Sequence, residues 1–212
     1  MSTVESPARR SELLRRGLLL EFVTVGWNLI EGVIAVLAAL ASGSVALLGF
    51  GVDSFVESIS GSVLIWRLSS ETRGNADEDA IERIERRAEQ LVGISFFALA
   101  LYVAFDAVTS LLNQERPAAS AVGIALTSVS IGVMLWLART KRRTAAELGS
   151  RALAADAEQT QACWYLSVMV LAGIGLNALF GWWWADPVAA LGVALILLRE
   201  GAEAWSGEDD ND

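Results

Sequence analysis

Two carboxylates stand one helical turn apart in an otherwise apolar stretch of the chain. Asp53 and Glu57 belong to the sequence GFGVDSFVES, residues 49–58. At positions i and i+4, their side chains project from the same face of a helix. An isolated acid near the centre of a bilayer costs about 2.5 to 3.5 kcal/mol. The pair therefore predicts a partner, which can be a metal cation, protons, or a basic residue on another helix.

The composition is that of an integral membrane protein. Of the 212 residues, 54% are hydrophobic, and the mean hydropathy is +0.46, which is too apolar for a typical soluble protein. The formal net charge is −9. Much of the acid falls after residue 70 and in the final GEDDND, where solvated charge says little about partners and gives no indication of nucleic acid binding.

The lack of histidine and the lack of enzyme motifs limit the kinds of site that the chain can form. The chain has no histidine and one cysteine, Cys163, so a metal site must be built from oxygen ligands with at most one sulfur. The sequence shows no nucleophile beside a base, no phosphate-binding loop and no cofactor fingerprint. We therefore expect neither an enzyme nor a permanently bound cofactor.

Six apolar segments have the length of about 20 residues that a helix needs to cross the hydrocarbon core. They cover residues 17–41, 44–69, 91–112, 118–137, 154–180 and 183–204. The expected fold is an all-α membrane protein with six transmembrane helices in one domain, residues 17–205. Residues 1–16 and the acidic residues 206–212 are expected to form cytoplasmic tails, and residues 70–90 and 138–153 cytoplasmic loops.

The basic residues sort to one side of these predicted spans. Only Arg116 falls on the opposite side; the others precede the first span, lie in residues 67–87 or 139–151, or end the sixth span at Arg199. The positive-inside rule then places both termini in the cytoplasm. Within residues 70–90, the pattern predicts a short amphipathic helix, either a solvated extension or a metal-sensing acid cluster.

Several acids lie inside the predicted spans, and we expect no basic residue at comparable depth to pair with them. These acids are Glu21, Glu31, Asp53, Glu57, Asp106, Asp156, Glu158 and Asp186. Near span ends, Glu21, Asp106 and Asp186 suit capping or interfacial roles. Glu31 is deeper, and its assignment to a structural role or to a proton path, with Asp106 as another candidate, stays open. The low dielectric also allows neutral, hydrogen-bonded carboxyls at Asp53 and Glu57.

The fifth predicted helix offers more ligands in ADAEQTQAC, residues 155–163. Gln159 and Cys163 repeat the i, i+4 spacing, and Asp156 lies on the same face. A tetrahedral site needs about two ligands beyond the first pair. Cys163 can equally be a small buried apolar residue. The sequence thus predicts a metal site drawn from Asp53, Glu57, Asp156, Gln159 and Cys163.

Three motifs in this order resemble the transmembrane domain of cation diffusion facilitator transporters. They are GS-x-ALL-x-x-x-x-D-S-x-x-E-S from residue 43, GSRAL-x-ADA from residue 149, and W-ADP-x-AALG-x-A from residue 184. The resemblance runs over about residues 17–205. It implies six helices with cytoplasmic termini and exchange of zinc or related divalent ions for protons. The form is closest to a short branch without the cytoplasmic C-terminal domain, similar to the transmembrane protein 163 group.

In that family the metal site takes an i, i+4 pair from the second helix and another from the fifth. The resemblance therefore implies Asp53 and Glu57 as the first pair and Gln159 and Cys163 as the second. Gln159 and the lack of histidine depart from the usual family ligands, and Asp156 is a further candidate. Sulfur at Cys163 favours zinc or softer ions.

The expected function is divalent cation transport, with zinc as the first candidate ion, by alternating access with proton antiport in the cell membrane. Manganese, iron or another cation stays open as the substrate. The expected partners are the lipid bilayer, the divalent cation and protons, with a homodimer left open. The alternative function is a non-transporting membrane metal sensor or regulatory partner of the same fold.

Overall fold

The computed structural model describes residues 7–73 and 78–206, and these form six α-helices. The helices are α1 (Pro7–Ser42), α2 (Val45–Arg73), α3 (Glu78–Asn113), α4 (Ala121–Leu148), α5 (Arg151–Phe180) and α6 (Ala185–Ser206). The expected all-helical fold with six helices is confirmed.

Helices α1 to α5 are long and apolar enough to cross a membrane. Helix α6 occupies the sixth predicted position. Charged residues lie at both of its ends, with Asp186 near its start and Arg199 and Glu200 near its end. It nevertheless packs within the bundle, against α2, α3 and α5. Its apolar middle is fully buried, as the side chains of Ala190, Val193 and Leu197 show.

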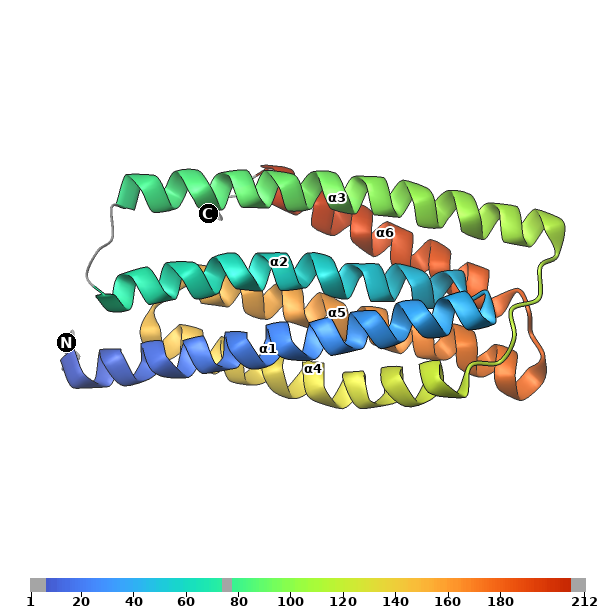
Figure 1. Ribbon diagram of the computed structural model, residues 1–212, viewed down its shortest axis with the longest axis horizontal. Helices are drawn as coiled ribbons and strands as arrows, with labels where there is room; N and C mark the ends of the chain where they lie inside the picture. The colour runs from blue at the N-terminus through green and yellow to red at the C-terminus, as the bar shows by residue number, and fades with distance from the viewer. Residues whose placement is uncertain (1–6, 74–77, 207–212) are drawn as a thin grey trace.

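The helices run alternately in opposite directions, so α1 begins and α6 ends toward the same end of the molecule (Figure 1). Helix α2 packs against α1, α3, α5 and α6, and helix α5 packs against α2, α4 and α6. These two helices therefore share the interior of the bundle. Polar side chains on their facing surfaces are shielded from the surroundings.

Two apolar layers enclose a polar band in the middle of the bundle. On α2, Phe50 and Val56 belong to a large hydrophobic cluster, whereas Leu64 and Leu68 belong to a second cluster toward the end where α1 begins. Glu57 lies between the two. Helices α1 and α5 follow the same order. On α1, Glu21, Asn28 and Glu31 lie between Leu14 of the second cluster and Ala35 of the first; on α5, Asp156, Thr160 and Cys163 lie between Leu153 and Leu166. These side chains, with Asp53 and Glu57, form the polar band.

The two predicted cytoplasmic loops are largely helical. Helix α4 continues past residue 137 to Leu148, and only Gly149, with φ of 67°, and Ser150, the N-cap of α5, separate the two helices. Hydropathy ended the predicted span where the charged run begins, but one face of the helix stays buried beyond that point. Between α2 and α3, residues 74–77 and the side chains of 71–92 lie outside the described part of the structure. The two alternatives for this segment, a solvated helical extension and a metal-sensing acid cluster, therefore stay predictions.

Asp186 links the start of α6 to the start of α2. Its carboxylate accepts hydrogen bonds from Ser44 Oγ at 2.5 Å and from the Val45 backbone N–H at 3.0 Å. An acid at this place satisfies an unpaired N–H of the first helical turn and complements the helix dipole. The capping role expected for Asp186 is confirmed.

Candidate metal site

Three of the predicted ligands meet in the polar band. The i, i+4 spacing turns Asp53 and Glu57 toward α5, and Cys163 faces them from that helix. The Cys163 thiol donates to Glu57 Oε2 at 3.0 Å and lies 3.4 Å from Asp53 Oδ2. All three residues are at least 95% buried. Two helices thus bring two carboxyls and one thiol together at one buried location.

Glu57 contacts side chains of both α1 and α5. Its Oε2 also accepts a hydrogen bond from Asn28 Nδ2 of α1 at 2.7 Å, and its Oε1 lies 3.4 Å from the Thr160 hydroxyl of α5. One turn away, Ser54 donates to Glu31 Oε2 at 3.2 Å. Helices α1, α2 and α5 therefore all contribute polar groups around the acid pair.

The cluster is closed in this conformation. Among the residues that the structure describes, no group of three or more Asp, Glu or Cys side chains is positioned to hold a metal ion. The Cys163 thiol is hydrogen-bonded to both acids instead. A divalent cation binding here would take the place of the thiol proton and would require these side chains to turn toward it.

Asp156 is held away from the cluster by a buried lysine. Lys141 of α4 forms ion pairs with Asp156 and with Glu21 of α1, at 3.1 Å from Glu21 Oε1. Lys141 and Glu21 are fully buried. The expectation that acids inside the spans lack a basic partner is therefore wrong for these two, and Glu21 is no terminal cap because α1 begins at Pro7.

Lys141 reaches the acid cluster only indirectly. Its Nζ lies 3.3 Å from the Thr160 hydroxyl, the same hydroxyl that approaches Glu57. No direct ion pair joins Lys141 to Asp53 or Glu57 within the described residues. Of the three partners that the sequence left open for the acid pair, a basic residue is therefore not in direct contact with it among the described residues.

Gln159 is not brought to the acid pair either. Its side chain is half-buried, and its Oε1 accepts a hydrogen bond from Ser60 Oγ at 3.2 Å. Ser60 follows Glu57 by three residues on α2. The contact fastens α5 to α2 beside the cluster, so Gln159 and Cys163 diverge although they share a helix face.

The two candidates for a proton path, Glu31 and Asp106, lie in different parts of the bundle. Glu31 is 99% buried in the polar band, bonded to Ser54 through Oε2, while its Oε1 has no hydrogen-bond partner. Asp106 is half-buried on α3 and takes no part in the hydrogen-bond network around Glu57. Only Glu31 lies in the polar band with the predicted ligands.

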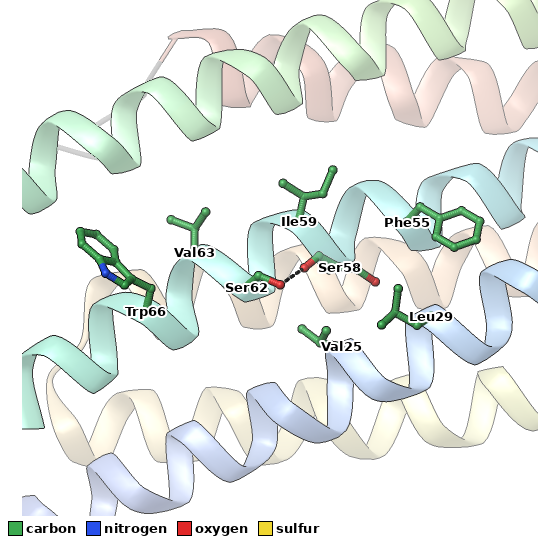
Figure 2. A pocket seen from close by; sticks show the side chains of 8 residues that line it. All are labelled: Val25, Leu29, Phe55, Ser58, Ile59, Ser62, Val63 and Trp66. Atoms are coloured by element: carbon green, nitrogen blue, oxygen red, sulfur yellow. Dashed lines mark hydrogen bonds between the residues drawn. The ribbon is translucent and has the colours of Figure 1, made fainter.

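A groove of about 510 Å³ runs along the outer face of α1 and α2 (Figure 2). Its lining is mostly apolar, including Val25, Leu29, Phe55, Ile59 and Trp66, together with two serines. Leu29, Ile59 and Trp66 are exposed on the surface. None of the acids of the metal site lines this groove, so it gives no access to them.

Three polar residues of this region received no role from sequence reasoning: Asn28, Lys141 and Thr160. A signal for Lys141 exists. Buried positions on α4 recur every three or four residues from Ser130 through Met134 and Leu137 to Lys141 and Leu148. Following this face through the charged run would have placed Lys141 inward.

A family model matches most of the chain. The model of the cation efflux transmembrane domain matches residues 22–205. This range contains the acid pair, Cys163, Asn28 and Lys141, and leaves out only the first part of α1 and the final residues.

Curated relatives agree with that match. An uncharacterized transporter of Synechocystis is 31% identical over 168 residues, which is 78% of this chain and 52% of the relative. A cadmium, cobalt and zinc/H(+)-K(+) antiporter of Bacillus subtilis is 27% identical over 203 residues, 88% of this chain and 60% of the relative. The cation-efflux pump FieF of Shewanella oneidensis is 28% identical over 165 residues, 76% and 55% of the two chains. The chain thus spans little more than half the length of these relatives.

Proposed function

The chain belongs to the cation efflux family, whose members are membrane transporters and not enzymes, and from this premise we propose that it exchanges a divalent metal cation for protons. The observation that carries the proposal is the buried cluster of Asp53, Glu57 and Cys163 at the contact of α2 and α5. The similarity to the cadmium, cobalt and zinc/H(+)-K(+) antiporter of Bacillus subtilis supports the ion class.

The ligand chemistry supports a borderline-soft cation such as zinc. Two carboxylates neutralise its two charges, and the thiolate of Cys163 favours zinc or cadmium over magnesium or calcium. The same three groups accept protons when the cation leaves, because each ligand must be deprotonated to bind it. Protons and cation therefore compete for one location, which is the requirement for antiport.

Alternating access would open this location to one side at a time. The apolar layers on both sides of the polar band fit an occluded state, in which neither face of the membrane reaches the acids. The asymmetry of basic residues supports cytoplasmic termini. The bacterial relatives favour the cell membrane as the location, and a homodimer is compatible with the fold.

The test is metal flux in proteoliposomes under an imposed pH gradient, measured for zinc, cadmium and manganese. We expect gradient-driven flux of zinc and cadmium in the unmodified protein, and loss of at least about tenfold in Asp53→Asn and Glu57→Gln. Serine at position 128, exposed on α4, provides a matched control, since Ser128→Ala should transport normally.

Two outcomes would contradict the proposal. Unchanged flux in both acid variants would remove the carboxylates from the site. Metal binding without flux for any of the three ions would favour the alternative, a membrane metal sensor of the same fold.

A further inference from the structure

Asn28 is fully buried, and only one end of its side-chain amide has a hydrogen-bond partner. Its Nδ2 donates to Glu57 Oε2 at 2.7 Å, while its Oδ1 is buried and has no hydrogen-bond partner. An unpaired buried acceptor costs about 1 to 3 kcal/mol. Such a group inside a packed helical bundle calls for a partner that the closed conformation does not provide.

The amide contacts the proposed cation site through Glu57. The atom that it contacts, Glu57 Oε2, is the same oxygen that accepts the Cys163 thiol at 3.0 Å. In the closed conformation an N–H donor suits this place, because it faces a carboxyl oxygen. A bound cation at Glu57 would reverse that preference and attract an oxygen instead.

Half a turn about the bond from Cβ to Cγ exchanges the two ends of an asparagine amide. The turn would withdraw Nδ2 from Glu57 and put Oδ1 in its place. The amide oxygen would then find the positive partner that it lacks. The exchange needs no movement of the α1 backbone.

We propose that Asn28 of α1 is the fourth cation ligand, through Oδ1, beside Asp53, Glu57 and Cys163. This inference rests on the proposed function and deepens it, since it brings α1 into a site expected from α2 and α5 alone. The ligand set becomes two carboxylates, one thiolate and one amide oxygen, which fits a four-coordinate divalent cation.

The other candidates for a fourth ligand that α5 offers are already engaged. Gln159 is half-buried, and its oxygen accepts from Ser60. Asp156 is paired with Lys141. Taking either one would break a contact with a partner outside the cluster, whereas Asn28 would exchange its N–H contact with Glu57 for an oxygen contact with the cation.

Two substitutions separate a ligand from a group that merely holds Glu57 by its N–H. Asn28→Asp keeps an oxygen and the side-chain shape but loses the donor; Asn28→Leu loses both. We expect Asn28→Asp to bind Cd²⁺ within about threefold of the unmodified protein or more tightly. We expect Asn28→Leu to bind at least about tenfold more weakly.

Cobalt(II) added to the purified protein gives a second readout that does not depend on transport. A four-coordinate cobalt ion absorbs strongly in the visible region, and its thiolate band reports Cys163. In Asn28→Leu we expect the thiolate band to remain while the visible absorption falls, because one ligand is lost. Gln159→Leu tests the rival ligand, and we expect both signals to remain because its oxygen is bonded to Ser60 outside the cluster. Ser128→Ala, exposed on α4, is the control.

The outcomes distinguish the two proposals. Equal Cd²⁺ affinity and equal cobalt absorption in Asn28→Leu would overturn the ligand role of Asn28, and so would Asn28→Asp binding as weakly as Asn28→Leu. Loss of binding in Gln159→Leu, with Asn28→Leu intact, would assign the fourth ligand to Gln159. An unmodified protein that binds neither ion would refute the proposed function itself.

Discussion

Cys163 is the one sulfur ligand in the proposed cation site, whose other proposed ligands bind through oxygen. Its thiol contacts both Asp53 and Glu57, so a change there acts directly on the ligand set. A sulfur ligand selects softer ions, and a carboxylate selects harder ones. The identity of this one side chain should therefore set the preference among divalent cations.

We expect Cys163→Asp to keep metal transport while shifting preference from cadmium toward manganese by at least about tenfold. Competition between the two ions in the flux assay measures the shift. Gln159→Ala, one turn away on the same helix, should change the preference by less than about threefold because its contact is with Ser60. An unchanged preference in Cys163→Asp would exclude sulfur as a ligand.

The acid pair could be predicted from the sequence because two charges in an apolar run have few explanations. The sequence could not predict which of Asp156, Gln159 and Cys163 lies beside the acid pair. All three share one helix face, and their separation depends on Lys141 and Ser60, which lie on other helices. Neighbours that are distant in sequence decide which member of a helix face reaches the site.

At the scale of elements, the contact of α1 and α2 depends on small residues. A Cβ built on Gly51 would lie 2.9 Å from Ala35 Cβ and 2.9 Å from the Val36 backbone nitrogen. The Gly51 carbonyl oxygen would in turn lie 3.0 Å from a Cβ on Gly32. Close backbone approach of this kind is typical of helix packing in membranes. It brings Asn28 of α1 to Glu57 of α2.

Gly51→Ala should push these helices apart and destabilise the protein by about 1 to 3 kcal/mol. The thermal midpoint of the purified protein in detergent measures this loss. Gly132→Ala on α4 is the matched control, because no atom lies within 4 Å of its Cβ, and a helical Gly→Ala change is favourable by up to about 1 kcal/mol. A midpoint in Gly51→Ala equal to that of the control would show that the contact tolerates expansion.

The helices themselves could be predicted from hydropathy, and their ends could not. Hydropathy averages over all faces of a helix, so it ended the fourth span at residue 137. The structure continues α4 to Leu148 because the inward face stays buried through Lys141 and Thr144. The same averaging hid Lys141, the basic residue that pairs with Glu21 and Asp156.

At the scale of the whole molecule, Lys141 joins three helices. Its Nζ is paired with Glu21 on α1 and Asp156 on α5, and it extends from α4. Removing one member of a buried ion pair leaves an uncompensated charge, which costs about 3 to 5 kcal/mol. The three helices are therefore held together in part by a single ammonium group.

We expect Lys141→Met to lower stability by about that amount, measured as the thermal midpoint in detergent. The variant Lys141→Met, Glu21→Gln, Asp156→Asn, which removes all three charges, should recover much of the loss. Arg9→Ala is the control at the surface: Arg9 lies 3.9 Å from Glu147 with both side chains exposed, where a pair is worth about 0 to 1 kcal/mol. Equal midpoints for Lys141→Met and Arg9→Ala would contradict a structural role for the buried triad.

Cys163 is the only cysteine in the chain, and it is 95% buried between the two apolar layers. Any thiol reagent that reacts with the protein therefore reports on one atom at the centre of the bundle. Site-directed labelling usually begins by replacing native cysteines, and this protein needs no such step. The unmodified chain carries its own probe, so the rate of thiol modification from each side of a vesicle becomes a direct record of which face of the membrane the site is open to.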